Sequence, residues 1–113
     1  MKNNFEMALR ISSDLMTYCH HHGAKEHGTK ITEGDESIQY VISGYPVDIT
    51  DEQYEDIVKK LHAPRQRDVE NDFWELIGES EDFSEMMLVG MSCDEVEISY
   101  VDRKLTFTLL RYY

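Results

Sequence analysis

Cysteine and histidine side chains cluster in one short stretch of the sequence. Cys19 is followed directly by three histidines, His20 to His22, and His27 lies a few residues further on. Thiolate and imidazole groups suit zinc or nickel. Adjacent helical residues point about 100° apart, so only Cys19 and His22 would share a face, with His27 joining them from a loop. One hypothesis is a small metal-binding protein that uses Cys19, His22 and His27; the alternative is a helix C-terminus, where the dipole favours histidine.

A second candidate is a small basic island formed by Arg65 and Arg67 in an acidic stretch. Both precede a predicted helix, a place where the helix dipole disfavours positive charge. Their guanidinium groups either pair with neighbouring carboxylates or recognise a carboxylate or phosphate on a partner. Trp74 lies in an aromatic and methionine-rich group that forms either an interface or part of the core. Arg65, Arg67 and Trp74 are therefore the residues predicted to bind a protein partner.

The sequence contains no recognisable catalytic motif. No Ser–His–Asp or Cys–His–Asn pattern can be singled out, and the G-x-S-x-G motif is absent. Cys19 and Cys93 lie on or beside predicted apolar faces, which indicates buried, unreactive thiols in a reducing compartment. We predict no catalytic residue and no cofactor, and we do not expect an enzyme.

The charge of the chain excludes several classes of partner. The 113 residues include 23 Asp and Glu against 11 Lys and Arg, a net charge of −12. Residues 48–97 hold 16 acidic and 4 basic side chains, a net of −12, and the other residues hold 7 of each. An acidic domain lacks the positive surface that nucleic acids and anionic membranes require. We expect one domain, residues 1–113, in the bacterial cytoplasm, without a signal peptide or membrane span.

Hydrophobic spacing predicts two α-β-β units separated by further helices. The predicted elements are a helix over 5–22, a hairpin over 29–43, helices over 51–61, 65–77 and 84–91, and a hairpin over 96–109. The first helix is expected to bury Phe5, Ala8, Leu9, Leu15, Met16, Cys19 and His22. Thr50 and Gln53 form a capping-box pattern at the start of the second helix. The fold class is therefore α+β: a two-layer sandwich in the order αββ-αα-αββ, whose two hairpins make a four-stranded sheet with helices on one face.

This order resembles the histidine-kinase-type ATPase fold, the GHKL superfamily, and in particular the bacterial anti-sigma-factor kinases. The first helix, with Leu15-Met16-Thr17 before Tyr18 and an ending at His22-Gly23, is similar to the family's N-box helix. Ile49-Thr50-Asp51-Glu52 looks like the end of its glycine-rich segment. Met86-Met87-Leu88-Val89 followed by Asp94-Glu95-Val96 is similar to its last helix and the next strand. The resemblance covers residues 5–111 and implies an ATP-binding domain.

The sequence departs from the family at each position that contacts nucleotide. Alignment places Tyr18 where the family has a magnesium-binding asparagine, and Gly44 where an aspartate reads adenine. The following glycines are replaced by Pro46 and Asp48. Glu85 stands where a glycine-rich helix N-terminus would cradle the phosphates, and its carboxylate would repel them. The resemblance therefore implies a degenerate member that has lost ATP binding. We expect a non-catalytic protein that acts through protein contacts in signalling or transcriptional regulation, with a homodimer through Tyr112 and Tyr113 as one possibility.

Overall fold

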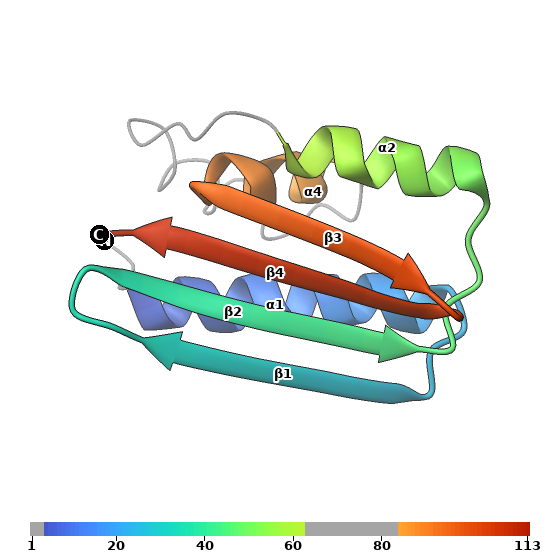
Figure 1. Cartoon of the computed structure of the whole chain (residues 1–113), viewed down its shortest axis with the longest axis horizontal. Helices are drawn as coiled ribbons and strands as arrows, with labels where there is room; N and C mark the ends of the chain where they lie inside the picture. The colour runs from blue at the N-terminus through green and yellow to red at the C-terminus, as the bar shows by residue number, and fades with distance from the viewer. Residues whose placement is uncertain (1–3, 63–83) are drawn as a thin grey trace.

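The computed structural model describes residues 4–62 and 84–113 (Figure 1). In these two ranges the chain forms an α+β structure with three helices and four strands. The elements are α1 (Asn4–His21), β1 (Glu26–Glu33), β2 (Ser37–Tyr45), α2 (Asp51–Leu61), α4 (Ser84–Met91), β3 (Glu95–Val101) and β4 (Lys104–Tyr112). The predicted α+β class, both hairpins and these three helices are confirmed. The helix predicted over residues 65–77 lies outside the described residues.

The four strands form one antiparallel sheet in the order β1-β2-β4-β3. Each hairpin supplies two neighbouring strands, and β2 pairs with β4 to join the hairpins. The predicted inner residues Ile38, Tyr40 and Ile42 are fully buried, as are Phe107 and Leu109 on β4. Because alternate residues of a strand point to opposite faces, these side chains line one face together. α1 packs chiefly on β2 and lies behind the sheet in Figure 1.

The buried face of α1 differs from the predicted one. Phe5 and Leu9 were expected in the core, but they are 44% and 50% exposed. The buried stripe instead runs along Met7, Ala8, Ile11, Ser12, Leu15 and Cys19. Both stripes have helical spacing, so periodicity alone could not choose between them. Ala8, Leu15 and Cys19 belong to both stripes and are buried as predicted, whereas Met7, Ile11 and Ser12 are buried in place of Phe5 and Leu9.

The closest approach of α1 to the sheet joins Cys19 to Gly44. A Cβ atom built on Gly44 would lie 2.5 Å from the Cβ of Cys19 and 2.8 Å from its Sγ. Only glycine leaves room for this contact, since heavy atoms in van der Waals contact lie about 3.5–4 Å apart. Gly44 therefore has a packing role at the end of β2.

The start of α2 agrees with the sequence prediction. The Thr50 hydroxyl accepts a hydrogen bond from the backbone N–H of Gln53 at 3.1 Å, and the Gln53 side chain accepts one from the N–H of Thr50 at 2.9 Å. This reciprocal pair satisfies two N–H groups that a helix N-terminus otherwise leaves unpaired. The helix then presents Ile57 and Leu61 to the core.

The C-terminal tyrosines are held by different parts of the sheet: Tyr113 by the β1–β2 turn and the Tyr112 side chain by β3. The Tyr113 backbone N–H donates to the carbonyl of Glu36 at 3.1 Å, and its hydroxyl donates to the carbonyl of Gly34 at 2.9 Å. The Tyr112 hydroxyl donates to Glu95 at 2.9 Å.

Of the described helices, none is long and apolar enough to cross a membrane.

Candidate functional site

The predicted metal ligands do not come together. The side chain of Cys19 is fully buried against the sheet. The ring of His22 packs on Tyr18, with 4.5 Å between ring centroids, whereas the ring of His27 lies beside His20 at 6.0 Å. Across residues 4–62 and 84–113, no three His, Cys, Asp or Glu side chains are grouped so that they could hold a metal ion. Cys19, His22 and His27 thus contact three different sets of neighbours and do not converge on one site.

The residues predicted to bind a partner, Arg65, Arg67 and Trp74, lie outside the described residues.

Tyr18 is a half-buried residue near the C-terminal end of α1. Burial, together with the charges of Cys19 and Asp56, raises the pKa of the Tyr18 phenol to about 12. A neutral phenol of this kind is a poor ligand for a divalent cation, which prefers carboxylate, carbonyl and water oxygens. Both cysteines are buried, as predicted.

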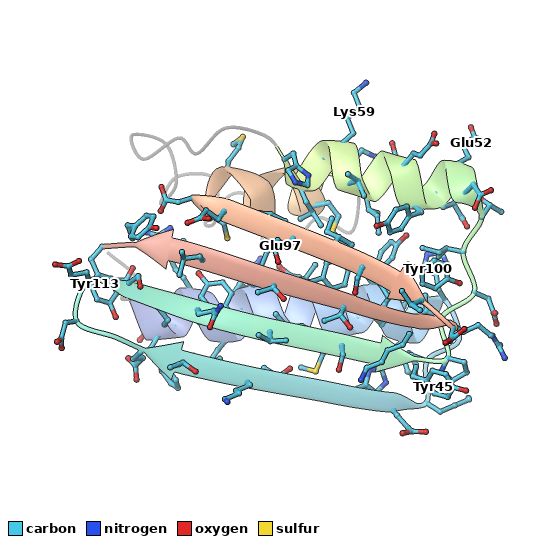
Figure 2. All side chains as sticks on the ribbon, in the orientation of Figure 1. Tyr45, Glu52, Lys59, Glu97, Tyr100 and Tyr113 are labelled. Atoms are coloured by element: carbon cyan, nitrogen blue, oxygen red, sulfur yellow. The ribbon has the colours of Figure 1, made fainter. Side chains whose placement is uncertain are left out.

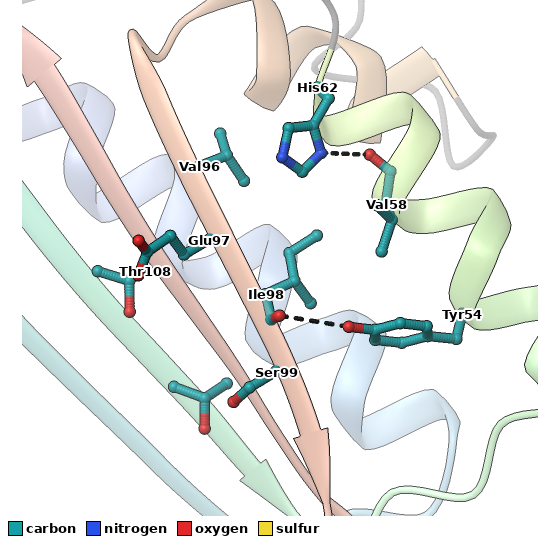
Figure 3. A pocket seen from close by; sticks show the side chains of 9 residues that line it. Tyr54, Val58, His62, Val96, Glu97, Ile98, Ser99 and Thr108 are labelled. Atoms are coloured by element: carbon teal, nitrogen blue, oxygen red, sulfur yellow. Dashed lines mark hydrogen bonds between the residues drawn. The ribbon is translucent and has the colours of Figure 1, made fainter.

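The structure does contain a groove of about 410 Å³ between α2 and the edge strand β3 (Figure 3). Its lining combines apolar side chains, hydroxyl groups, one carboxylate and one imidazole. The lining residues are Tyr54, Val58 and His62 from α2, Val96, Glu97, Ile98 and Ser99 from β3, and Thr106 and Thr108 from β4. This volume falls within the range of about 300–1,000 Å³ typical of ligand sites.

Helical spacing places the α2 side of the groove. Tyr54, Val58 and His62 follow one another at intervals of four residues, so they lie on the same face of the helix. His62 ends the helix, and its Nδ1 lies 2.7 Å from the carbonyl oxygen of Val58. Since a carbonyl can only accept, Nδ1 must carry the proton. Nε2 is then the imidazole nitrogen left for a ligand.

The backbone of β3 faces the groove. The Tyr54 hydroxyl donates to the carbonyl oxygen of Ile98 at 3.2 Å, so this carbonyl points away from β4 and toward α2 (Figure 3). In an antiparallel strand the N–H and C=O of one residue point the same way, and the direction alternates along the chain. The backbone groups of Val96 and Ile98 therefore point outward, into the groove. Among the described residues, no strand pairs with this edge.

The side chains of β3 divide the groove into two chemical halves. Figure 3 shows Val96 and Ile98 on the side of the strand that faces α2, and Glu97 and Ser99 on the other side, with Thr108. An extended chain laid along β3 would thus meet apolar groups with every second side chain and polar or acidic groups with the others.

The surroundings of the groove are acidic. Residues 48–62 carry five acidic and two basic side chains, and residues 94–97 carry three acidic ones. Together these segments carry a net charge of −6, half of that of the chain. Such a surface attracts cationic ligands and repels anionic ones.

Tyr100, beside Tyr54, connects β3 to the loop that precedes α2. Its hydroxyl donates to the carbonyl of Val47 and accepts a hydrogen bond from the N–H of Ile49 at 3.4 Å. Its ring stacks on Tyr54, with centroids 6.0 Å apart. The loop before α2 and the strand β3 are therefore connected directly, which sets the position of the helix beside the strand.

Sequence reasoning missed this groove because its residues come from three separate elements. The alternation of Val96, Ile98 and Tyr100 and the stripe of Tyr54 and Val58 are present in the sequence, where they indicate a core. Their half-exposed state depends on how far α2 sits from the sheet edge, which local patterns do not determine.

No protein-family model matches the sequence, and no curated protein matches it.

Proposed function

We propose that this chain is a non-catalytic regulatory protein that binds an extended, basic segment of a protein partner in the groove between α2 and β3. The observation that carries the proposal is the outward-pointing backbone of Val96 and Ile98, at a strand edge with which no described strand pairs. An extended peptide that adds to such an edge gains main-chain hydrogen bonds, and its side chains supply specificity.

The groove chemistry defines the segment further. Side chains directed toward α2 meet Val58, Val96 and Ile98, so apolar residues fit there. Side chains directed the other way meet Glu97 and Ser99, so lysine or arginine fits there. The bound segment therefore alternates apolar and basic residues, as a strand with one buried face does.

A fluorescein-labelled peptide of alternating valine and lysine tests this function by fluorescence anisotropy. We expect saturable binding that weakens as salt is added, and no binding of a matched valine–glutamate peptide. Glu97→Lys should weaken the binding. Glu36→Lys, which makes the same change of charge in the β1–β2 turn, should have a much smaller effect.

A backbone variant separates strand addition from simple charge attraction. Val96→Pro removes an N–H that points into the groove and leaves the pairing of β3 with β4 intact, which edge positions tolerate. We expect weaker binding with an unchanged circular dichroism spectrum. Equal binding by the wild type and Val96→Pro, or equal binding of the lysine and glutamate peptides, would refute the proposal.

We further propose that the chain is a degenerate GHKL-type domain of the bacterial cytoplasm, with the two-layer order αββ-αα-αββ. The two α-β-β units and the residues at the family's nucleotide positions support it. Calorimetry with ATP and magnesium is the test, and we expect no heat of binding; micromolar affinity would contradict the loss of nucleotide binding.

A further inference from the structure

The outer edge of β1 offers unpaired backbone groups. The N–H of Gly34 donates to the carbonyl of Ser37 at 2.8 Å, so the backbone of Gly34 faces β2. Alternation along the strand then turns the N–H and C=O groups of Thr29 and Ile31 away from β2. In the part of the chain that the structure describes, β1 is the last strand on this side of the sheet. Unpaired edges of this length readily pair with another strand.

One face of α1 runs along the same edge and is partly apolar. Phe5, Leu9, Met16 and His20 recur at helical spacing, so they share a face. This face lies beside β1, because the Thr29 hydroxyl donates to Sδ of Met16 at 3.2 Å and the rings of His20 and His27 lie 6.0 Å apart. Toward the N-terminus the face exposes Phe5 at 44% and Leu9 at 50%. The edge therefore combines free backbone groups with exposed apolar side chains.

Charge indicates what covers this edge. Residues 4–33 carry four acidic side chains (Glu6, Asp14, Glu26 and Glu33) and three basic ones (Arg10, Lys25 and Lys30), so this side is nearly neutral. The opposite edge, with α2 and β3, carries −6 in residues 48–62 and 94–97. A second copy of a chain this acidic meets less repulsion along β1 and α1 than along α2 and β3.

We infer that two copies of this chain associate along β1, with the strands antiparallel and α1 of one copy beside α1 of the other. A two-fold arrangement covers both free edges and both apolar helix faces at once, because each copy supplies the same surface. The sheet becomes continuous through both copies.

The side chains of β1 and the position of α1 together favour one register. A two-fold axis at Ile31 places Ile31 against Ile31 of the second copy and Lys30 opposite Thr32, with no like charges directly opposed. An axis at Lys30 would oppose two lysines, which destabilises strand pairing. The axis at Ile31 also lies beneath the middle of the α1 face that runs from Phe5 to His20. Backbone pairing and helix packing therefore agree on the same arrangement.

This interface stands apart from the proposed function. β1 and β3 are opposite edges of the sheet (Figure 1), so the groove of each copy stays open in the pair. Loss of peptide binding would leave the dimer unaffected, and loss of the dimer would leave each groove intact.

Light scattering coupled to size exclusion tests the inference on the full chain. We expect twice the mass of one chain for the wild type and a single-chain mass for both Leu9→Glu and Thr29→Pro. The first variant places a charge on the exposed helix face, and the second removes an outward N–H without touching the β1–β2 pairing. Val101→Glu, at a residue of β3 that is 64% exposed, adds the same charge on the other edge and should remain a dimer.

Leu9→Glu keeps the backbone intact, so it decides the question even if Thr29→Pro folds poorly. Hydrogen exchange gives a second measurement: the amides of Thr29 and Ile31 should exchange slowly in the wild type and faster in Leu9→Glu. A wild type that stays monomeric at high concentration, a dimer that survives Leu9→Glu, or one that Val101→Glu also dissociates, would overturn the inference.

Discussion

The Arg103 side chain donates two hydrogen bonds to Asp48, from Nε to Oδ1 at 2.9 Å and from Nη2 to Oδ2 at 2.9 Å. The Val47 N–H also donates to the carbonyl of Arg103 at 2.7 Å. Arg103 and Asp102 both have positive φ angles, 65° and 50°, which is typical of a two-residue turn that matches the twist of its strands. The β3–β4 turn is therefore attached to the loop that leads into α2, and this attachment positions one end of the groove.

The ion pair predicts a pH-dependent coupling between these two residues. Hydrogen bonds from Arg103 lower the pKa of Asp48. A carboxylate with a lowered pKa stabilises the folded state above its ordinary pKa, and that stabilisation is lost as the pH falls through the lowered value. In a double-mutant cycle of Asp48→Asn and Arg103→Gln, urea unfolding should therefore show favourable coupling at neutral pH and none in strong acid. Both groups are exposed, so we expect a small effect; coupling that persists in acid would contradict this assignment.

Gly44→Ala should destabilise the protein by about 1–3 kcal/mol, because the added methyl group overpacks the contact between α1 and β2. Neither backbone can withdraw without disturbing the core around Cys19. Gly28→Ala is the matched control, since its Cβ would meet only the Ser43 hydroxyl, at 3.0 Å, which can rotate. Urea unfolding measures both changes. Similar losses for the two variants would show that the close approach is not limiting.

The Cys19 thiol should react slowly in the folded protein and destabilise it in alkali. Burial raises the pKa of Cys19 from 9.0 to about 11. Between these values the unfolded chain loses the proton while the folded chain keeps it, so stability falls as the pH rises. Cys19→Ala should flatten this fall. Ellman's reagent should label the thiols at the rate of unfolding, and rapid labelling of Cys19 in native protein would refute its burial.

Tyr54→Phe should change stability and binding in opposite directions. Loss of the hydrogen bond to the carbonyl of Ile98 should destabilise the fold by about 0.5–1.5 kcal/mol. The same change frees that carbonyl for an incoming strand, so the valine–lysine peptide should bind more tightly. Tyr100→Phe also removes a hydroxyl, but one that bonds the loop at Val47 and Ile49, so it should lower stability without strengthening binding. Weaker peptide binding by Tyr54→Phe would show that the hydroxyl helps to hold the peptide.

Residues of α2 and β3 differ in whether they lie near the groove (Figure 2). Glu52 and Lys59 project from α2 away from the sheet, whereas Glu97 and Tyr100 lie among side chains near β3. All four belong to segments that the sequence assigns correctly to a helix or a strand. Which of them face a groove follows from the position of α2 beside β3, and that position depends on contacts such as Tyr100 with Val47.

The sequence by itself determined the elements whose signals are local. The capping box of Thr50 and Gln53, the alternation of Ile38, Tyr40 and Ile42, and the turn residues of both hairpins each act within a few residues, so each could be recognised without knowing the fold. The sequence also showed that the net negative charge lies in residues 48–97, because charged side chains can be counted without knowing the fold.

Only the tertiary structure decided how those elements share their surfaces. It buried Met7, Ile11 and Ser12 in place of Phe5 and Leu9, because the side of α1 that carries Cys19 approaches the sheet at Gly44. It separated Cys19, His22 and His27, and it left β1 and β3 as the two edges of the sheet in the described residues. Such outcomes depend on the packing of segments far apart in the chain, where several arrangements satisfy the same local pattern and close contact selects one of them.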